Sequence, residues 1–329
     1  RRAGRLLPAD QPAEAVFKGH REAVTCVRAH PIFGFVASGS DDTMVKVWDV
    51  ESGQLHRTLK GHTKAVTHVD FNPRGDLLAS SSSDLTIKLW SIQTFACVKT
   101  LAGHDHTVSC VAFLPSGDQL VSCSRDQTIK VWDVGTGYCN RTLSAHSEWV
   151  RAIAVSPDGA MLASAGNDQV VMVWSLASGE VTQELREHEH FVQALAFSPK
   201  ALALSTATGK EAEEGAGAAA VEGSEIVLLA SAGRDSVVCL WNPVAGSLLF
   251  VVRDHANWVN DLCFHPTAKY LMSASDDRTV KVIDVSRRRC LRTIEDAHGH
   301  FVTSLSLSPQ LGKLMTGGVD KEVHVWECR

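Results

Sequence analysis

The chain has 329 residues, 44% of them hydrophobic and 21% charged, which is the balance of a folded protein with a sizeable core. This composition excludes disorder along most of the chain, and no apolar run reaches the roughly 18 residues of a membrane-spanning helix. The formal net charge of −5 gives the molecule as a whole no attraction for phosphate backbones, so neither nucleic-acid binding nor a membrane span is expected.

The chain begins with polar residues 1–14, a predicted N-terminal tail without a hydrophobic targeting segment. Residues 15–329 follow as one predicted domain of short strands, the first of them at 15–18. Alternating apolar and polar residues then predict groups of four strands, the clearest at 66–71, 77–81, 87–90 and 97–101.

One unit recurs seven times along the chain, and its first mark is a histidine that precedes an apolar strand. These histidines are His20, His62, His104, His146, His188, His255 and His298. A hydroxyl residue follows on the second strand, at Ser38, Ser80, Ser122, Ser164, Ser231, Ser273 and Thr316. An aspartate comes four residues later, at Asp42, Asp84, Asp126, Asp168, Asp235, Asp277 and Asp320. Six residues further on, six units have a tryptophan and the sixth has Ile283 instead, the series being Trp48, Trp90, Trp132, Trp174, Trp241, Ile283 and Trp326.

Runs such as Thr128–Asp133 make this unit resemble the WD40 repeat, and the resemblance covers nearly the whole chain. It implies an all-β fold, a seven-bladed WD40 β-propeller in which the N-terminal strand 15–18 completes the last blade. In that family the His, Asp, Ser or Thr, and Trp of each unit form a hydrogen-bonded network inside the blade. The seven histidines and seven aspartates are therefore expected to be structural.

The remaining reactive side chains show no pattern of a catalytic or metal site. Three histidine pairs each contain one histidine of the repeat: His104/His106, His188/His190 and His298/His300. No matching cysteine pair accompanies them, so we expect no metal and no cofactor. The nine cysteines are expected to be small buried thiols of a reducing, cytosolic protein, and no nucleophile elbow, phosphate loop or dinucleotide fingerprint suggests an enzyme.

One unit is longer than the others because it carries an insertion at about residues 200–225, which is rich in Gly, Ala and Glu. This composition predicts a mobile loop between the first and second strands of the fifth blade. Two interpretations stay open, a tolerated surface insertion and a regulatory contact.

Function is expected where the units differ at exposed positions, because the shared residues build the ring. The residues that differ most are Arg125, Trp149, Arg151, Arg234, Trp258 and Arg278. All belong to loops or strand ends that are expected to open on one face of blades three to six. Arginines with exposed tryptophans are typical of a protein-binding hot spot. The alternative is that each arginine lies along a neighbouring tryptophan and binds nothing.

Several loops and the C-terminus are also similar to the C-terminal propeller of the lissencephaly-1 (NudF) family. These stretches are Arg125–Lys130, Thr136–Cys139, Glu148–Arg151, Glu184–His190, Ala297–Ser304 and Val325–Arg329. The resemblance implies that the dynein-binding residues are Arg125, Arg151, Arg234, Trp258 and Arg278, with Trp149 as an accessory residue. Asn260 stands where relatives have Arg, and Ile283 replaces a blade Trp, so the edge of this face and the packing of blade six depart from the family pattern.

The resemblance implies a noncatalytic module that binds the motor domain of the cytoplasmic dynein heavy chain and regulates its microtubule attachment and motility, with roles in nuclear migration and cell division. The expected location is the cytoplasm, on microtubules and at the centrosome or spindle pole. Further implied partners are NudE-type coiled-coil proteins and acetylhydrolase catalytic subunits. Two alternatives stay open: a regulatory subunit of a platelet-activating-factor acetylhydrolase, and a generic WD40 adaptor or peptide reader. This segment is expected to be a monomer, and the full-length protein a homodimer through an N-terminal region that this sequence lacks.

Overall fold

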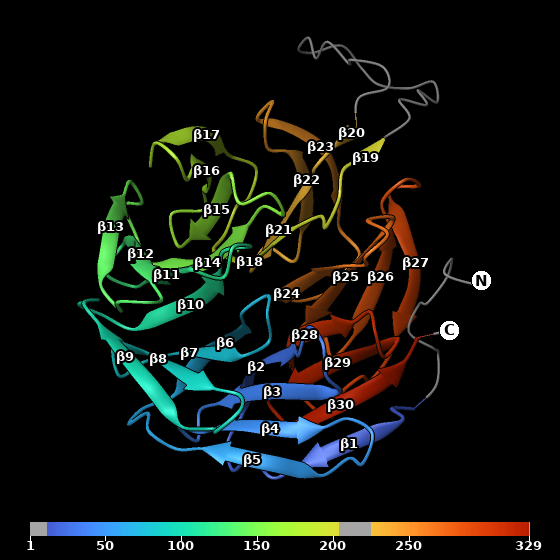
Figure 1. Cartoon of the computed structure of the whole chain (residues 1–329). Coiled ribbons are helices and arrows are strands. Elements are labelled where there is room, and N and C mark those ends of the chain that lie inside the picture. The colour runs from blue at the N-terminus through green and yellow to red at the C-terminus, as the bar shows by residue number, and fades with distance from the viewer. Residues whose placement is uncertain (1–11, 204–224, 329) are drawn as a thin grey trace, which may run out of the picture.

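The computed structural model describes residues 12–203 and 225–328, and the regular structure in these ranges is β-strand. Seven four-stranded antiparallel sheets stand around a central channel like the blades of a propeller (Figure 1). The predicted all-β, seven-bladed propeller is thereby confirmed. The same ranges contain no helix of the length and apolar character needed to cross a membrane.

Each blade places its first strand beside the channel. These innermost strands are β2 (Val24–Ala29), β6 (Val66–Phe71), β10 (Val108–Phe113), β14 (Val150–Val155), β18 (Val192–Phe197), β24 (Val259–Phe264) and β28 (Val302–Ser308). The second strands are β3 (Phe35–Ser40), β7 (Leu77–Ser82), β11 (Gln119–Ser124), β15 (Met161–Gly166), β21 (Leu229–Gly233), β25 (Tyr270–Ser275) and β29 (Lys313–Gly318).

The third and fourth strands lead outward to the rim. The third strands are β4 (Val45–Asp49), β8 (Thr86–Ser91), β12 (Thr128–Asp133), β16 (Val171–Ser175), β22 (Val238–Asn242), β26 (Val280–Asp284) and β30 (Glu322–Glu327). The fourth strands are β5 (Leu55–Leu59), β9 (Cys97–Ala102), β13 (Cys139–Ser144), β17 (Val181–Leu185), β23 (Ser247–Val252), β27 (Arg289–Ile294) and, in the last blade, β1 (Ala15–Lys18).

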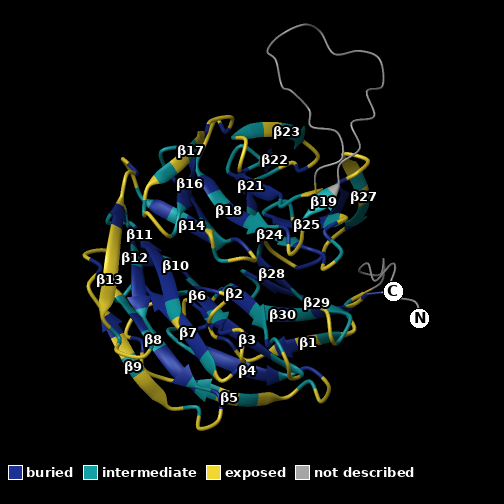
Figure 2. Cartoon of the chain, turned by 45° about the horizontal axis from the view of Figure 1, so that its top comes forward, coloured by how far each residue is buried: buried dark blue, intermediate teal, exposed yellow. Residues whose placement is uncertain are grey.

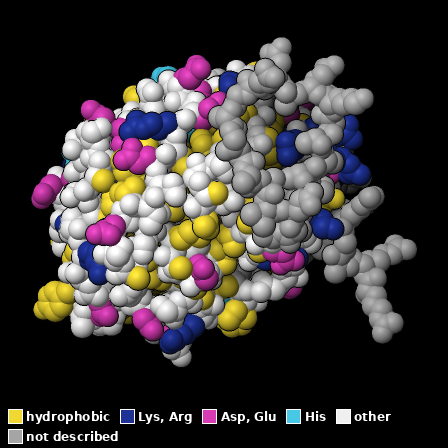
Figure 3. Space-filling view, turned by 90° about the horizontal axis from the view of Figure 1, so that it is seen from above, with side chains coloured by type: hydrophobic (Ala, Val, Ile, Leu, Met, Phe, Trp, Pro, Cys, Tyr) yellow, Lys and Arg dark blue, Asp and Glu magenta, His cyan; other side chains and the backbone are white. Residues whose placement is uncertain are grey.

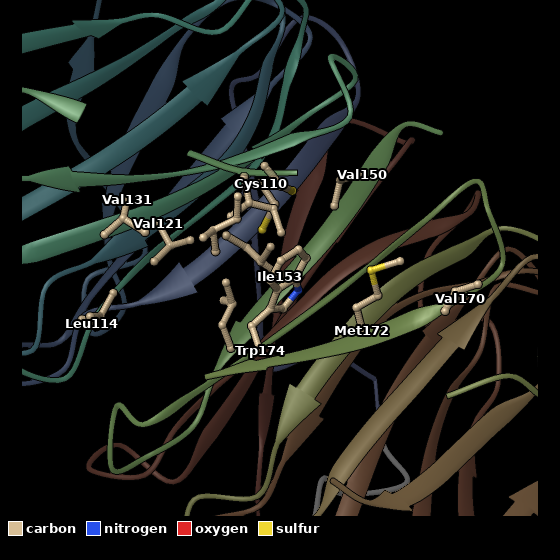
Figure 4. Close-up of a cluster of buried hydrophobic side chains, with 13 residues drawn as sticks. Cys110, Leu114, Val121, Val131, Val150, Ile153, Val170, Met172 and Trp174 are labelled. Carbon is tan, nitrogen blue, oxygen red and sulfur yellow. The ribbon is translucent and has the colours of Figure 1, made fainter. Parts of the chain in front are cut away.

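The core lies between neighbouring blades, and burial falls from the inner strands to the rim (Figure 2). The cluster between blades three and four shows the arrangement, with Cys110 and Val121 of one blade packed against Ile153 and Trp174 of the next (Figure 4). On the rim strand β13 only Leu143 is fully buried. Because every blade covers the apolar face of its neighbour, the ring has to close for all faces to be buried.

The predicted network is present in every blade. The histidine Nδ1 donates to the aspartate carboxylate at 2.6–2.9 Å, and Nε2 lies 2.7–2.8 Å from the Ser or Thr hydroxyl. In six blades the Trp indole N–H donates to the same hydroxyl at 2.7–3.0 Å. Blade six has no such donor, because Ile283 takes the place of the tryptophan in a buried cluster.

In the first two blades the network holds a neutral imidazole beside an ionised carboxylate. Burial of Asp84 would raise the pKa of its carboxyl, but hydrogen bonds from Thr86, His62 and the backbone outweigh burial and hold the pKa at about 2. The pKa values of all seven aspartates of the network are lowered. Burial lowers the pKa of His20 and His62, so these rings stay neutral between the aspartate and the hydroxyl.

The ring closes as predicted, because the N-terminal strand β1 pairs with β30 and so completes the last blade (Figure 1). Lys18 and Glu322 form an ion pair at 2.7 Å across this pairing. Phe17 is buried against Trp48 of blade one, with ring centroids 5.5 Å apart, so the closing strand also joins the first blade to the last.

The insertion leaves the propeller where the sequence predicts, between the first and second strands of blade five, and the short strands β19 (Leu202–Ala203) and β20 (Glu225–Ile226) flank it. Residues 204–224 and most of the predicted tail, 1–11, lie outside the described residues, so the prediction of a mobile loop stays a prediction. All nine cysteines are free thiols. The expectation of buried thiols is wrong for Cys97 and Cys139, which are exposed because they lie on the rim strands β9 and β13.

Candidate functional site

The two groups of loops that the sequence singled out meet on one face. In each blade the residue just before the network aspartate donates its backbone N–H to the residue just before the first strand. Arg125 bonds in this way to Thr107 at 3.0 Å, and Arg234 bonds to Phe191 at 2.9 Å. In each blade, the turn between the second and third strands therefore lies beside the loop that precedes the first strand.

Seven equivalent positions form a collar around the channel, because each is the second residue of a first strand. They are Thr25, Thr67, Ser109, Arg151, Gln193, Asn260 and Thr303. At three of them a threonine hydroxyl donates to the first carbonyl of the next blade, and Asn260 does the same with its amide, to Val302 at 2.8 Å. Asn260 therefore joins two blades through its side chain.

Arginines and aromatic rings alternate across blades three to six, and we name this set the arginine–aromatic row. Its members in order are Arg125, Trp149, Arg151, Phe191, Arg234 and Trp258.

The distances show that every arginine of the row lies over a ring. The guanidinium carbon of Arg125 is 4.7 Å from the centroid of Trp149, and that of Arg151 is 5.9 Å from the same ring and 5.4 Å from Phe191. The guanidinium carbon of Arg234 lies 5.3 Å from Phe191 and 4.1 Å from Trp258. These separations are within the range of cation–π attraction, so the rings hold the cations in place.

Two of the three guanidiniums are also fixed by one hydrogen bond each. Arg151 Nε donates to Asn167 Oδ1, and Arg234 Nε donates to Gln193 Oε1 at 2.6 Å. The terminal nitrogens of the three row arginines make no hydrogen bond to any described residue. Arginines elsewhere in the described part of the chain do form ion pairs, among them Arg28, Arg74, Arg186, Arg278 and Arg287.

The row carries a concentration of positive charge. Burial, followed by the like charges of Arg234 and Arg125, lowers the pKa of Arg151 to about 10. The side chain is still charged at neutral pH, and its neighbours repel it. Elsewhere, acidic and basic side chains are interspersed on the side of the ring (Figure 3), so this cluster is a local feature of a molecule with net negative charge.

The row borders a cavity at the mouth of the channel. Arg125, Arg151, Arg234 and Trp258 line a cavity of about 370 Å³, which continues into a deeper space of about 140 Å³ along the collar. Trp258 is exposed, with 38% of its surface accessible, whereas Trp149 is half-buried between the two arginines it contacts. The cavity therefore presents both guanidinium nitrogens without hydrogen-bond partners among the described residues and an exposed indole.

The cavity is charged asymmetrically, because blade six contributes the carboxylate of Asp276. Burial raises the pKa of Asp276, and the hydrogen bond from Asn260 together with the charge of Arg234 opposes that rise. Two amides connect the acid to the row. Asn260 Nδ2 donates to Asp276 at 2.6 Å, and Gln193 Nε2 donates to Asn260 Oδ1 at 3.0 Å while its own oxygen accepts from Arg234.

Five of the six residues that the sequence selected belong to the arginine–aromatic row, and the sixth does not. Arg278 does not line the cavity; its exposed guanidinium lies 3.7 Å from the Asp296 carboxylate. Phe191 is the residue that sequence reasoning missed. It lies three positions after its repeat histidine, as Trp149 and Trp258 do, and a search for any aromatic residue at that offset would have found it together with Phe301.

One group of side chains has the residue types of a metal site. Ligand atoms of His298, Asp320 and His324 lie within 4.8 Å of one another in blade seven. Both ring nitrogens of His298 are already bonded, to Asp320 and to Thr316, as in the other blades. The structural network accounts for this cluster, and the absence of a metal site stays a prediction.

The fold is a ring-shaped β-propeller, and the arginine–aromatic row lies at one mouth of its channel. The family described as "WD domain, G-beta repeat" matches residues 12–49, 53–91, 95–133, 137–175, 246–284 and 288–327, and the chain belongs to this WD40 repeat family. Residues 176–245, which include the first three strands of the fifth blade and the insertion between its first two, lie outside the matches. Each match begins before the rim strand of one blade and ends at or near the third strand of the next, so the repeats interlock the ring.

Fungal proteins named nuclear distribution protein PAC1 are similar to part of the chain. The protein of Tuber melanosporum is 45% identical over 94 residues, which are 28% of this chain and 21% of the relative. Those of Ajellomyces capsulatus and Yarrowia lipolytica are 44% and 41% identical over 86 and 101 residues, covering 26% and 29% of this chain and 19% and 23% of the relatives. The matched stretches thus span about a fifth of these relatives, and the similarity agrees with the predicted resemblance to the NudF family.

Proposed function

We propose that this chain binds the motor domain of cytoplasmic dynein through the arginine–aromatic row and thereby regulates the attachment of the motor to microtubules. The observation that carries the proposal is the set of three guanidiniums at the channel mouth that have no carboxylate partner among the described residues. The similarity to nuclear distribution proteins supports the choice of partner, because the NudF family that the loops resemble binds this motor.

The row suits an acidic protein surface. Its rings and the two Nε hydrogen bonds hold the guanidiniums before a partner arrives, so little side-chain freedom is lost on binding. Each cation then offers its terminal nitrogens to a carboxylate in the forked geometry that arginine favours. Trp258 adds an exposed apolar anchor beside the charges, and clusters of Arg and Trp are where alanine substitution costs most binding energy.

The proposal is tested by measuring binding of a purified dynein motor domain to the native chain and to a variant that combines Arg125→Ala, Arg151→Ala, Arg234→Ala and Trp258→Ala. We expect the variant to bind at least about 100-fold more weakly. Arg278→Ala, tested alone, should weaken binding less, because this arginine is exposed and already paired with Asp296.

The chain offers a matched control for the chemistry of the row. Arg57 lies over Phe95 and Arg288 over Phe250, each at 5.7 Å, and neither arginine lines the channel mouth. A variant with Arg57→Ala and Arg288→Ala removes the same kind of contact elsewhere and should bind the motor domain as the native chain does. Equal binding by the row variant and the native chain would overturn the assignment of the face.

A further inference from the structure

We infer that the channel mouth is also a binding site for a small polyanion, a molecule that carries several clustered phosphate groups. The inference concerns a soluble small ligand and does not depend on the proposed motor partner. It is based on three properties of the arginine–aromatic row: its unbalanced charge, its rigidity, and the volume of the cavity that it lines.

The first property is charge without compensation. Arg125 and Arg151 lie on the same Trp149 ring, and Arg151 and Arg234 lie on the same Phe191 ring, each within 6 Å of the centroid. Repulsion within this set is part of what lowers the pKa of Arg151. An anion placed among the three cations relieves this repulsion and gains attraction from all of them, and a group with two or more charges gains most.

The second property is that the cations are already in position. The Nε hydrogen bonds of Arg151 and Arg234 and the rings on either side fix the planes of the guanidiniums and leave the terminal nitrogens without partners among the described residues. Fixed, bidentate donors are the groups that proteins use to recognise phosphate. Flexible surface lysines would lose side-chain entropy on binding, whereas these arginines lose little.

The third property is the size and lining of the cavity. Its volume of about 370 Å³ falls in the range of about 300–1,000 Å³ that small-molecule sites occupy. Thr107 and Ser109 add hydroxyls to the wall beside Arg125 and Arg151. Asp276 lies on the blade-six side of the same cavity and repels an anion from there, so the phosphates are directed to the wall formed by blades three to five.

The experiment measures direct binding of two probes, linear tripolyphosphate and inositol hexakisphosphate, to the whole chain by isothermal titration calorimetry and by thermal unfolding at fixed ionic strength. We expect one-to-one binding of at least one probe and a rise of several degrees in the unfolding temperature. Sulfate at the same ionic strength is the control, because it screens charge but carries only one anionic group per molecule. It should leave the unfolding temperature nearly unchanged. If only one probe binds, the result shows whether the cavity accepts phosphates on a linear chain or on an inositol ring.

Two variants assign the binding to the row. Arg151→Gln should weaken probe binding by at least about tenfold, because it removes the central cation. Arg125→Gln serves as a second variant that keeps the fold, since its side chain makes no hydrogen bond to the described residues. Arg57→Gln, away from the mouth, is the matched control and should bind as the native chain does. The inference is overturned if neither probe binds the native chain, or if both row variants bind as tightly as the control.

This result is independent of the motor experiment, because no motor domain is present in the titration. A chain that binds the motor but neither probe loses only the polyanion site, and a chain that binds a probe but not the motor loses only the proposed function. If both hold, the polyanion and the acidic surface of the motor compete for the same guanidiniums.

Discussion

The blade network and the arginine–aromatic row differ in how the charges of their side chains are compensated. In the network each buried aspartate is matched by an imidazole and by backbone and hydroxyl donors, and the arrangement recurs in all seven blades. In the row three cations lie together on one side of the ring without an acid bonded to any of them among residues 12–203 and 225–328. Balanced charge marks the scaffold of this propeller, and unbalanced charge marks the surface available for a ligand.

Acid is expected to have the largest effect on stability, because it protonates the aspartates of the network and leaves the arginines of the row charged. The folded-state pKa of Asp84 is about 2 and its ordinary value is 3.8, so its contribution to stability is present above pH 4 and is lost as the pH falls through 2. The six other aspartates shift in the same direction. His20 and His62 have lowered pKa values, so the unfolded chain gains protons first as the pH falls below 6.5, which adds to the loss.

We therefore expect the unfolding temperature to fall modestly between pH 7 and 5 and steeply between pH 4 and 2, as followed by circular dichroism. Arg125→Gln, which alters the row but no group of the network, should give the same pH profile. A native chain whose unfolding temperature is constant from pH 7 to 3 would contradict the account of the network.

A single hydroxyl tests the network at neutral pH. Ser122 joins His104 Nε2 and Trp132 Nε1, each at 2.8 Å, in a fully buried position. Ser122→Ala leaves both nitrogens without this partner and should lower the free energy of unfolding by about 3 kcal/mol in urea titrations. Arg125→Gln should lower it by less than about 1 kcal/mol. Similar losses from the two substitutions would show that the row is structural too.

Two glycines at the ends of second strands lie against the backbone of the loops that carry Trp149 and Phe191. A Cβ added at Gly166 would lie 1.9 Å from the backbone oxygen of Trp149, and one at Gly233 would lie 2.1 Å from that of Phe191. Gly166→Ala must therefore displace the loop that carries Trp149, and we expect a loss of about 2 kcal/mol in the free energy of unfolding together with weaker ligand binding at the row. Gly135→Ala, where the nearest atom is 3.4 Å away, is the matched control and should change neither.

The smallest expected effect comes from repairing the one incomplete network. Ile283→Trp should place an indole N–H against Ser273, as in the six other blades, and raise the free energy of unfolding by about 1 kcal/mol. A crystal structure of the variant would show whether the indole reaches the hydroxyl. Destabilisation would mean that the packing of Ile283 with Leu240 and Val259 has become specific to the smaller side chain.

The fold was predictable from the sequence because the network fixes the order of His, Ser or Thr, Asp and Trp. That order recurs in every unit, although the insertion lengthens the interval from His188 to Ser231 and Ile283 replaces one Trp. Most of the row was predictable for the opposite reason, because Arg125, Arg151 and Arg234 occupy positions at which the residue type differs between units. Phe191 was missed because the search weighed tryptophan alone. The pairing of Arg278 with Asp296 depends on the loop after β27, which follows no repeat, so no sequence rule places that acid.

The pairing of β1 with β30 also determines how the ring responds to force. Ala15, at the start of β1, lies opposite Val325, near the end of β30, so the two ends of the chain leave the blade on the same side. Tension that separates these ends peels the strands apart one hydrogen-bonded pair at a time and does not load all pairs together. We therefore expect a load that pulls Ala15 away from Val325 to open blade seven before it disturbs the six other blades.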